Sequence, residues 1–117
     1  MILYHGSVHD LDWPDYAAIA EHADSAQHPR GLHVLPTAEA AAVYGQVYCL
    51  SVADEDVTYD HTACLQYRPR HLLFRLGIKA IINPDGSGVI IDLDAVTHFA
   101  PVVGIEPTVT TRIPVMQ

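Results

Sequence analysis

The chain has 117 residues and a formal net charge of −8, with 6 Lys and Arg against 14 Asp and Glu. This length fits a single domain with one core over residues 1–117, and a hydrophobic content of 50% excludes a disordered chain. A free-standing nucleic-acid-binding protein needs a basic surface to neutralise phosphates, so the charge argues against that class. The acidic surface is compatible with docking onto a basic protein partner, although ordinary solubility explains it equally well.

No membrane span or secretory signal is expected. The longest apolar stretches, such as residues 102–105, fall far short of the roughly 20 residues that a spanning helix needs. Met1 is followed by strand-like residues and not by a basic and then an apolar segment. We therefore expect a soluble protein of the bacterial or host cytoplasm. Neither C-x-x-C nor H-E-x-x-H occurs among 2 Cys and 8 His, so no metal site is predicted.

The first part of the chain predicts strands that alternate with helices. A strand over residues 1–5 ends at a glycine, and a helical spacing of apolar residues covers 15–23 after a proline. Residues 31–35 form a short apolar strand. An alanine-rich helix follows, with Thr37 as its N-cap and Gly45 as its C′ residue.

The second part predicts further short strands and one more helix. Asp-Gly tolerates positive φ and therefore favours a hairpin turn within 83–88. We predict strands at 46–52, 78–82, 89–93 and 95–105, an exposed acidic connection at 53–61 and a short helix that ends at Gly77. Short strands with two or three helices between them indicate an α+β domain with an antiparallel or mixed sheet.

The motif Tyr4-His5-Gly6-Ser7 ends the first strand, and "GLHVLPTAEAAAVYG" at 31–45 leads from a second strand into a helix. This order resembles the ADP-ribosyltransferase superfamily of the diphtheria-toxin and poly(ADP-ribose) polymerase type, in which Y-H-G-[ST] begins the NAD site. The resemblance covers residues 1–104. It implies a split β-sheet around an NAD cleft, with NAD consumed as a co-substrate.

The resemblance also implies which residues bind NAD. His5 would bond a ribose hydroxyl, the backbone of Gly6 would approach the nicotinamide carboxamide, and Ser7 would add a hydroxyl to the rim. His33 stands where the family usually has a tyrosine against nicotinamide, and Tyr44 matches a second aromatic position. Without the resemblance, His5 would be an ordinary half-buried histidine at a strand end and Gly6 a turn glycine. Tyr44 would be a helix residue packed in the core.

A carboxylate near the ribose 2′-hydroxyl stabilises the oxocarbenium-like state of nicotinamide loss. Relatives place a glutamate at the start of the last motif strand, where this chain has Ser87. Asp85 is the expected catalytic replacement, with Asp92 and Asp94 as further candidates. Small phage-borne members of the superfamily, including anti-CRISPR transferases, resemble this chain in carrying an aspartate after a strand like 77–81. The alternative for Asp85 is an ordinary turn aspartate.

An arginine is expected to meet the NAD pyrophosphate, and the sequence does not choose among Arg30, Arg68, Arg70 and Arg75. The resemblance implies a mono-ADP-ribosyltransferase that modifies a protein, as a phage or bacterial effector such as an anti-CRISPR protein or a toxin. Loops 22–30 and 53–61 would select the target.

Two alternatives stay open at this point. The missing glutamate favours a catalytically inactive protein of the same fold that binds NAD or a partner. An RNA 2′-phosphotransferase also uses NAD, but the low content of basic residues opposes it.

Overall fold

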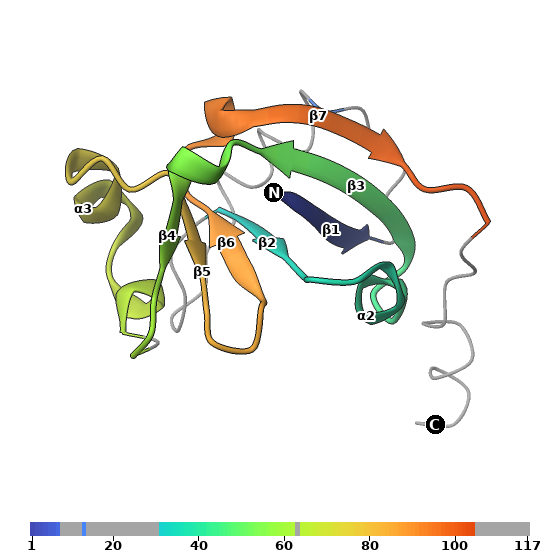
Figure 1. The fold of residues 1–117 in the computed structure, drawn as a ribbon, viewed down its shortest axis with the longest axis horizontal. Helices are drawn as coiled ribbons and strands as arrows, with labels where there is room; N and C mark the ends of the chain where they lie inside the picture. Colours follow the sequence, from blue (N-terminus) through green and yellow to red (C-terminus); the bar gives the residue numbers. More distant parts are fainter. Residues whose placement is uncertain (8–12, 14–30, 63, 105–117) are drawn as a thin grey trace.

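Two small β-sheets face each other in the computed structural model of the chain, which describes residues 1–7, 13, 31–62 and 64–104 (Figure 1). The first sheet has the order β1-β3-β7, and the second has the order β2-β6-β5-β4. Their bounds are β1 Ile2–Ser7, β2 Leu32–Val34, β3 Gln46–Val52, β4 Val57–Tyr59, β5 Ala80–Ile82, β6 Gly88–Ile90 and β7 Val96–Pro101. The β4–β5 pair is parallel and the other pairs are antiparallel, so the strand arrangement is mixed, as predicted.

Short helices lie at the two ends of this arrangement. The α-helix α2 (Ala38–Ala42) lies at the end of β1 and β3, and α3 (Arg70–Arg75) lies beyond β4 at the opposite end (Figure 1). The 3-10 helices are η1 (Asp54–Asp56), η2 (Leu65–Tyr67) and η3 (Leu93–Ala95). The fold is therefore α+β, in agreement with the sequence. Among the described residues, none of the helices is long and apolar enough to cross a membrane.

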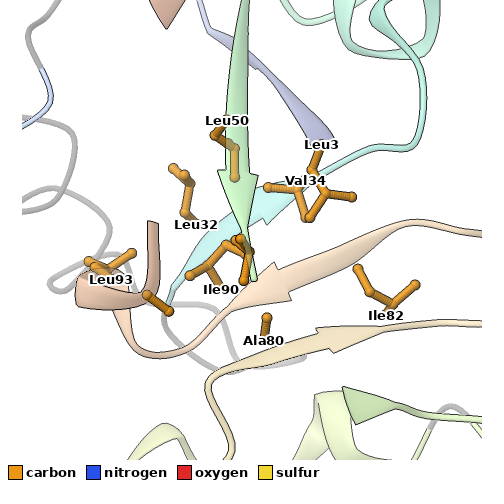
Figure 2. Packing of buried hydrophobic residues seen from close by; sticks show 10 residues of the cluster. Leu3, Leu32, Val34, Leu50, Ala80, Ile82, Ile90 and Leu93 are labelled. Atoms are coloured by element: carbon orange, nitrogen blue, oxygen red, sulfur yellow. The ribbon is translucent and has the colours of Figure 1, made fainter. Parts of the chain in front are cut away.

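The main core fills the space between the two sheets. Leu3 and Leu50 from β1 and β3 meet Leu32, Ile82 and Ile90 from the second sheet (Figure 2). Each of these side chains is at most 5% exposed. Burial of a side chain of this size stabilises the fold by about 1.5–3 kcal/mol, so this cluster holds the two sheets together.

The outer face of each sheet is covered by one helix. Ile81 and Val89 pack against Leu73 of α3, whereas their strand neighbours face the main core. On the other sheet Val47 packs against Ala41 and Ala42 of α2. Side chains on a strand alternate between its faces, so residues 80–82 and 88–90 are buried on both and read as apolar runs.

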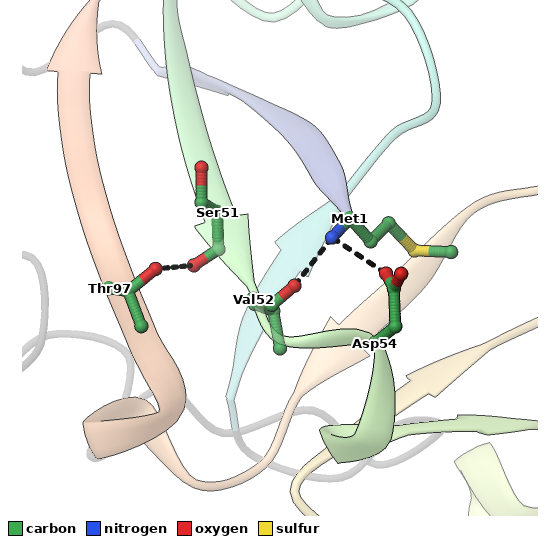
Figure 3. A network of polar contacts seen from close by, with 5 residues as sticks. All are labelled: Met1, Ser51, Val52, Asp54 and Thr97. Atoms are coloured by element: carbon green, nitrogen blue, oxygen red, sulfur yellow. Dashed lines mark hydrogen bonds and ion pairs between the residues drawn. The ribbon is translucent and has the colours of Figure 1, made fainter.

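Polar contacts fix the ends of the first sheet (Figure 3). The amine of Met1 donates to the carbonyl of Val52 at 2.6 Å and to the carboxylate of Asp54 at 2.9 Å. Thr97 Oγ1 donates to the carbonyl of Ser51 at 3.2 Å, where the register of β3 and β7 shifts. These bonds align β1 and β7 on either side of the central strand.

The predicted caps of α2 are partly correct. Thr37 Oγ1 accepts from the amide of Ala40 at 3.1 Å, which confirms the N-cap. The C-cap is Val43, so Gly45 lies two residues beyond the cap and is not the C′ residue. Gly45 nevertheless has a φ of +134°, which glycine adopts without strain as the chain turns into β3.

The prediction of an exposed connection over 53–61 is only partly correct, because several of its residues are exposed but the segment has regular structure. This segment contains η1 and β4, and it ends in the buried Asp60. The Asp60 carboxylate accepts from the amides of Cys64 and Leu65 at 3.1 and 2.7 Å, which compensates its burial. The strand predicted over 46–52 is present with the predicted bounds, and the other predicted strands and the helix ending at Gly77 are present with shifted bounds. The predicted helix over 15–23 lies outside the described residues.

Leu50 provides a test of the core between the sheets. Leu50→Ala should lower the free energy of unfolding by about 3 kcal/mol, because a cavity would remain at a side chain that is 0% exposed. Leu76→Ala removes the same atoms from a side chain that is 65% exposed and should change it by less than about 0.5 kcal/mol. Urea unfolding would measure both, and equal effects of the two variants would contradict this core.

Candidate functional site

A cleft of about 550 Å³ opens where β1, β2 and the β5–β6 hairpin meet. Four of the five expected NAD-binding residues line it together with the expected catalytic carboxylate, namely His5, Gly6, His33, Tyr44 and Asp85. The fifth, Ser7, lies at the end of β1 opposite Gln46 and is not part of the lining. The chain therefore brings together residues from four separate segments at one place.

His5 joins the two sheets at the floor of the cleft. Its Nδ1 donates a hydrogen bond to the carbonyl of His33 at 2.8 Å. Burial lowers the pKa of the imidazole because it disfavours the charged form, and the bond to His33 only partly offsets this effect. At neutral pH the ring is therefore neutral, with Nδ1 as the donor and Nε2 as an acceptor.

Gly6 has two structural reasons to be a glycine. A Cβ at this position would collide with the carbonyl of Ala41 in α2 and lie 3.1 Å from Tyr44 Cβ. The N–H and C=O groups of a strand alternate in direction, and those of Tyr4 point to Leu35. The N–H and C=O of Gly6 thus point to the same edge, where they bond no other backbone group of the described residues.

Two aromatic rings form exposed parts of the lining. Tyr44 follows α2 and is 58% exposed, so the alternative that it packs in the core is wrong. His33 is exposed on β2, opposite Val89 of β6. Both side chains therefore present exposed surface in the lining of the cleft.

The hairpin between β5 and β6 forms the remaining wall. The amide of Asn83 donates to the carbonyl of Ser87 at 2.7 Å, and the amide of Gly86 donates to the carbonyl of Asn83 at 2.9 Å. Gly86 has a φ of +89°, which closes a three-residue loop of the kind that joins antiparallel strands. The predicted hairpin turn is confirmed.

Asp85 presents an exposed carboxylate at this hairpin. Its Oδ1 accepts from the hydroxyl of Ser87 at 2.6 Å and from the Ser87 amide at 3.0 Å. These two bonds lower the pKa of Asp85 below its ordinary value, because they favour the ionised carboxyl group. Both of these bonds reach Oδ1, and because Asp85 is exposed the carboxylate remains accessible to a ligand.

The other candidate acids do not reach the cleft. Asp92 caps η3 by accepting from the amide of Asp94 at 3.1 Å, and both acids border a separate hollow beside α3. Asp92 and Asp94 therefore do not line the cleft that contains Asp85.

The described arginines also lie elsewhere. Arg70 and Arg75 line the hollow beside α3, where Arg70 Nε donates to the carbonyl of Ile91 at 3.0 Å. Arg68 follows η2 and is not part of the cleft lining. Arg30 lies outside the described residues. No Lys or Arg of the described part of the chain lines the cleft.

The sequence alone did not reveal that the hydroxyl of Ser87 bonds to Asp85, nor that Asn83 lines the cleft. The spacing of an aspartate two residues before a serine amide is typical of such a turn and is the signal that was available. In the part of the chain that the structure describes, no three His, Cys, Asp or Glu side chains are grouped to hold a metal ion. No protein-family model, curated protein or solved structure matches the chain, so its function is inferred from the cleft.

The bond between Ser87 and Asp85 predicts a measurable pKa difference. The pKa of Asp85 should lie below its ordinary value and rise in Ser87→Ala, whereas Ser87→Thr keeps the hydroxyl and should preserve the lowered pKa. Carbon-detected NMR of the carboxyl group during an acid titration would measure all three proteins. Since the folded pKa is the lower one, the contribution of Asp85 to stability is present above the unfolded pKa and is lost as the pH falls through the folded pKa. An unchanged pKa in Ser87→Ala would contradict the geometry.

Proposed function

We propose that this protein is a mono-ADP-ribosyltransferase that cleaves NAD and transfers ADP-ribose to a protein target. The observation that supports the proposal is the common lining of one cleft by His5, Gly6, His33, Tyr44 and Asp85. These residues come from β1, β2, the turn after α2 and the β5–β6 hairpin. The proposal requires this combination, because each residue alone has an ordinary structural explanation.

The cleft lining fits the nicotinamide riboside half of NAD. A carboxamide has both a donor and an acceptor, and Gly6 offers a backbone C=O and N–H on one edge of β1. The neutral ring of His5 provides an acceptor at Nε2 for a ribose hydroxyl. The exposed rings of His33 and Tyr44 can stack on nicotinamide.

Asp85 supplies the charge that the reaction needs. When the C1′–N bond of NAD breaks, its electron pair goes to the pyridinium ring, neutral nicotinamide leaves and positive charge develops on the ribose. A carboxylate stabilises this state, and Asp85 Oδ2 is accessible to accept a hydrogen bond from the 2′-hydroxyl. A target nucleophile then bonds to C1′ and loses its proton.

A second hollow of about 420 Å³ lies beside the same hairpin and is the place we propose for the target side chain. It is lined by Pro84 and Gly86 from the hairpin, by Tyr59 at the end of β4 and by His61 just after that strand. The acidic 3-10 helix η1 precedes these two rings in the chain. A basic protein of the host, such as a nucleic-acid-binding protein, is the target class that this charge favours, which would suit a phage or bacterial effector.

Asp85→Asn tests the proposed chemistry. The change keeps the size of the side chain and removes its charge, so nicotinamide release should fall by roughly 10²–10³-fold while NAD still raises the melting temperature. Asp94→Asn neutralises an exposed acid outside the cleft and should leave release unchanged. Chromatography of free nicotinamide and a thermal melt with and without NAD would measure both quantities.

The results of these two measurements distinguish an active transferase from a catalytically inactive protein of the same fold. NAD binding without nicotinamide release in the wild type would favour the catalytically inactive NAD-binding protein. Equal release by the wild type and Asp85→Asn would show that Asp85 is not the catalytic carboxylate. The absence of both binding and release would overturn the proposed function.

The salt dependence of labelling tests whether the target is a basic protein that docks by electrostatic attraction. Labelling of a lysate protein from labelled NAD should weaken several-fold between 50 and about 200 mM salt, because exposed charges are screened over about 10 Å at 0.1 M. Nicotinamide release without lysate should change much less. Glu55→Gln removes one exposed charge of η1 and should reduce the salt dependence of labelling. Labelling that does not respond to salt would contradict electrostatic docking.

A further inference from the structure

Ser87 stands beside the proposed catalytic carboxylate in the wall of the cleft. Its Oγ lies 2.6 Å from Asp85 Oδ1 and donates its proton to that atom. This distance is within the roughly 2.5–2.7 Å range of hydrogen bonds from hydroxyl groups to ionised carboxylates. The hydroxyl is therefore polarised toward a base before any ligand arrives.

The hairpin limits the movement of this hydroxyl. The Ser87 carbonyl accepts from the Asn83 amide at 2.7 Å, and the Ser87 amide donates to Asp85 at 3.0 Å. Both backbone polar groups of the residue are thus held within the turn. A nucleophile fixed beside the reacting atoms has a high effective concentration, which an external acceptor can reach only by binding.

We propose that Ser87 is a self-modification site, at which the protein transfers ADP-ribose from NAD to its own hydroxyl with Asp85 as the base. This inference rests on the proposed function, because it uses the same cleft and the same cleavage of NAD. It adds a specific acceptor for ADP-ribose, namely the hydroxyl group of a serine in the chain itself. The acceptor occupies the position at which the resemblance places a catalytic glutamate.

The transfer of ADP-ribose from NAD to Ser87 needs no further reactant. The C1′–N bond of NAD breaks, and its electron pair neutralises the pyridinium ring of the leaving nicotinamide. Ser87 Oγ forms a bond to C1′, and its proton passes to Asp85 Oδ1 along the existing hydrogen bond. A strong base is unnecessary because the oxocarbenium-like carbon is itself highly electrophilic. Asp85 then returns its proton to solvent, to which it is exposed.

Self-modification would limit the enzyme. ADP-ribose attached to Ser87 remains in the cleft that Asp85 and His33 also line, so it excludes a second NAD molecule. In the absence of a target, each chain should therefore accept one ADP-ribose and then lose NAD binding.

Mass spectrometry of the pure protein after incubation with NAD tests the inference. The intact mass should increase by one ADP-ribose, and fragmentation of peptides should place it on Ser87. Ser87→Ala should show at least a tenfold loss of this adduct, and Asp85→Asn should lose it as well. Ser87→Thr keeps a hydroxyl and should be modified. Ser51→Ala removes a serine on β3 outside the cleft lining and should be modified like the wild type.

Free nicotinamide and the melting temperature with NAD are measured in the same samples. Nicotinamide release without an adduct on Ser87 would overturn the inference and leave the proposed function standing. An adduct that persists in Ser87→Ala would place the acceptor elsewhere and would also overturn it. The absence of NAD binding and release would overturn the proposed function and this inference together.

Discussion

The cleft depends on the contact between β1 and the end of β2, where hydrogen bonds between described residues join the two sheets. Tyr4 exchanges two backbone bonds of 3.0 and 2.7 Å with Leu35, and His5 Nδ1 reaches the carbonyl of His33 at 2.8 Å. Among the described residues this backbone pairing is an isolated bridge, so the chain leaves β2 for α2 while β1 continues along β3 as far as Ser7. That divergence leaves the N–H and C=O of Gly6 without a backbone partner among the described residues and creates the opening that the hairpin borders.

The close approach of α2 then determines the shape of this opening. The carbonyl of Ala41 occupies the space where a Cβ of residue 6 would lie, so a glycine is needed for packing, in addition to the access that the proposed NAD site would require. The same approach brings Tyr44, which follows the helix, to the cleft. The packing requirement and the proposed binding requirement therefore coincide at one residue, and substitution of Gly6 alone cannot separate them.

The sequence predicts the features that depend on local chemistry, including the Thr37 cap, the turn at Gly86 and the strand over 46–52. The sequence does not predict features whose structure depends on contacts with segments distant in the chain. The strand at 57–59 lies in an acidic segment and forms because it pairs in parallel with β5. Arg70 and Arg75 point away from the cleft because α3 covers the opposite end of the second sheet, which no local pattern reveals.

The exposure of Asp85 sets a condition on the proposed chemistry. A carboxylate in water stabilises a nearby positive charge weakly, since the attraction between two unit charges at 4 Å is only about 1 kcal/mol there and rises as water is excluded. The open hairpin leaves the carboxylate accessible, and its two bonds from Ser87 keep it ionised without burial. The stacked nicotinamide and the incoming acceptor must therefore exclude water themselves. In such a site the ligands complete the low-dielectric environment that larger enzymes build from their own side chains.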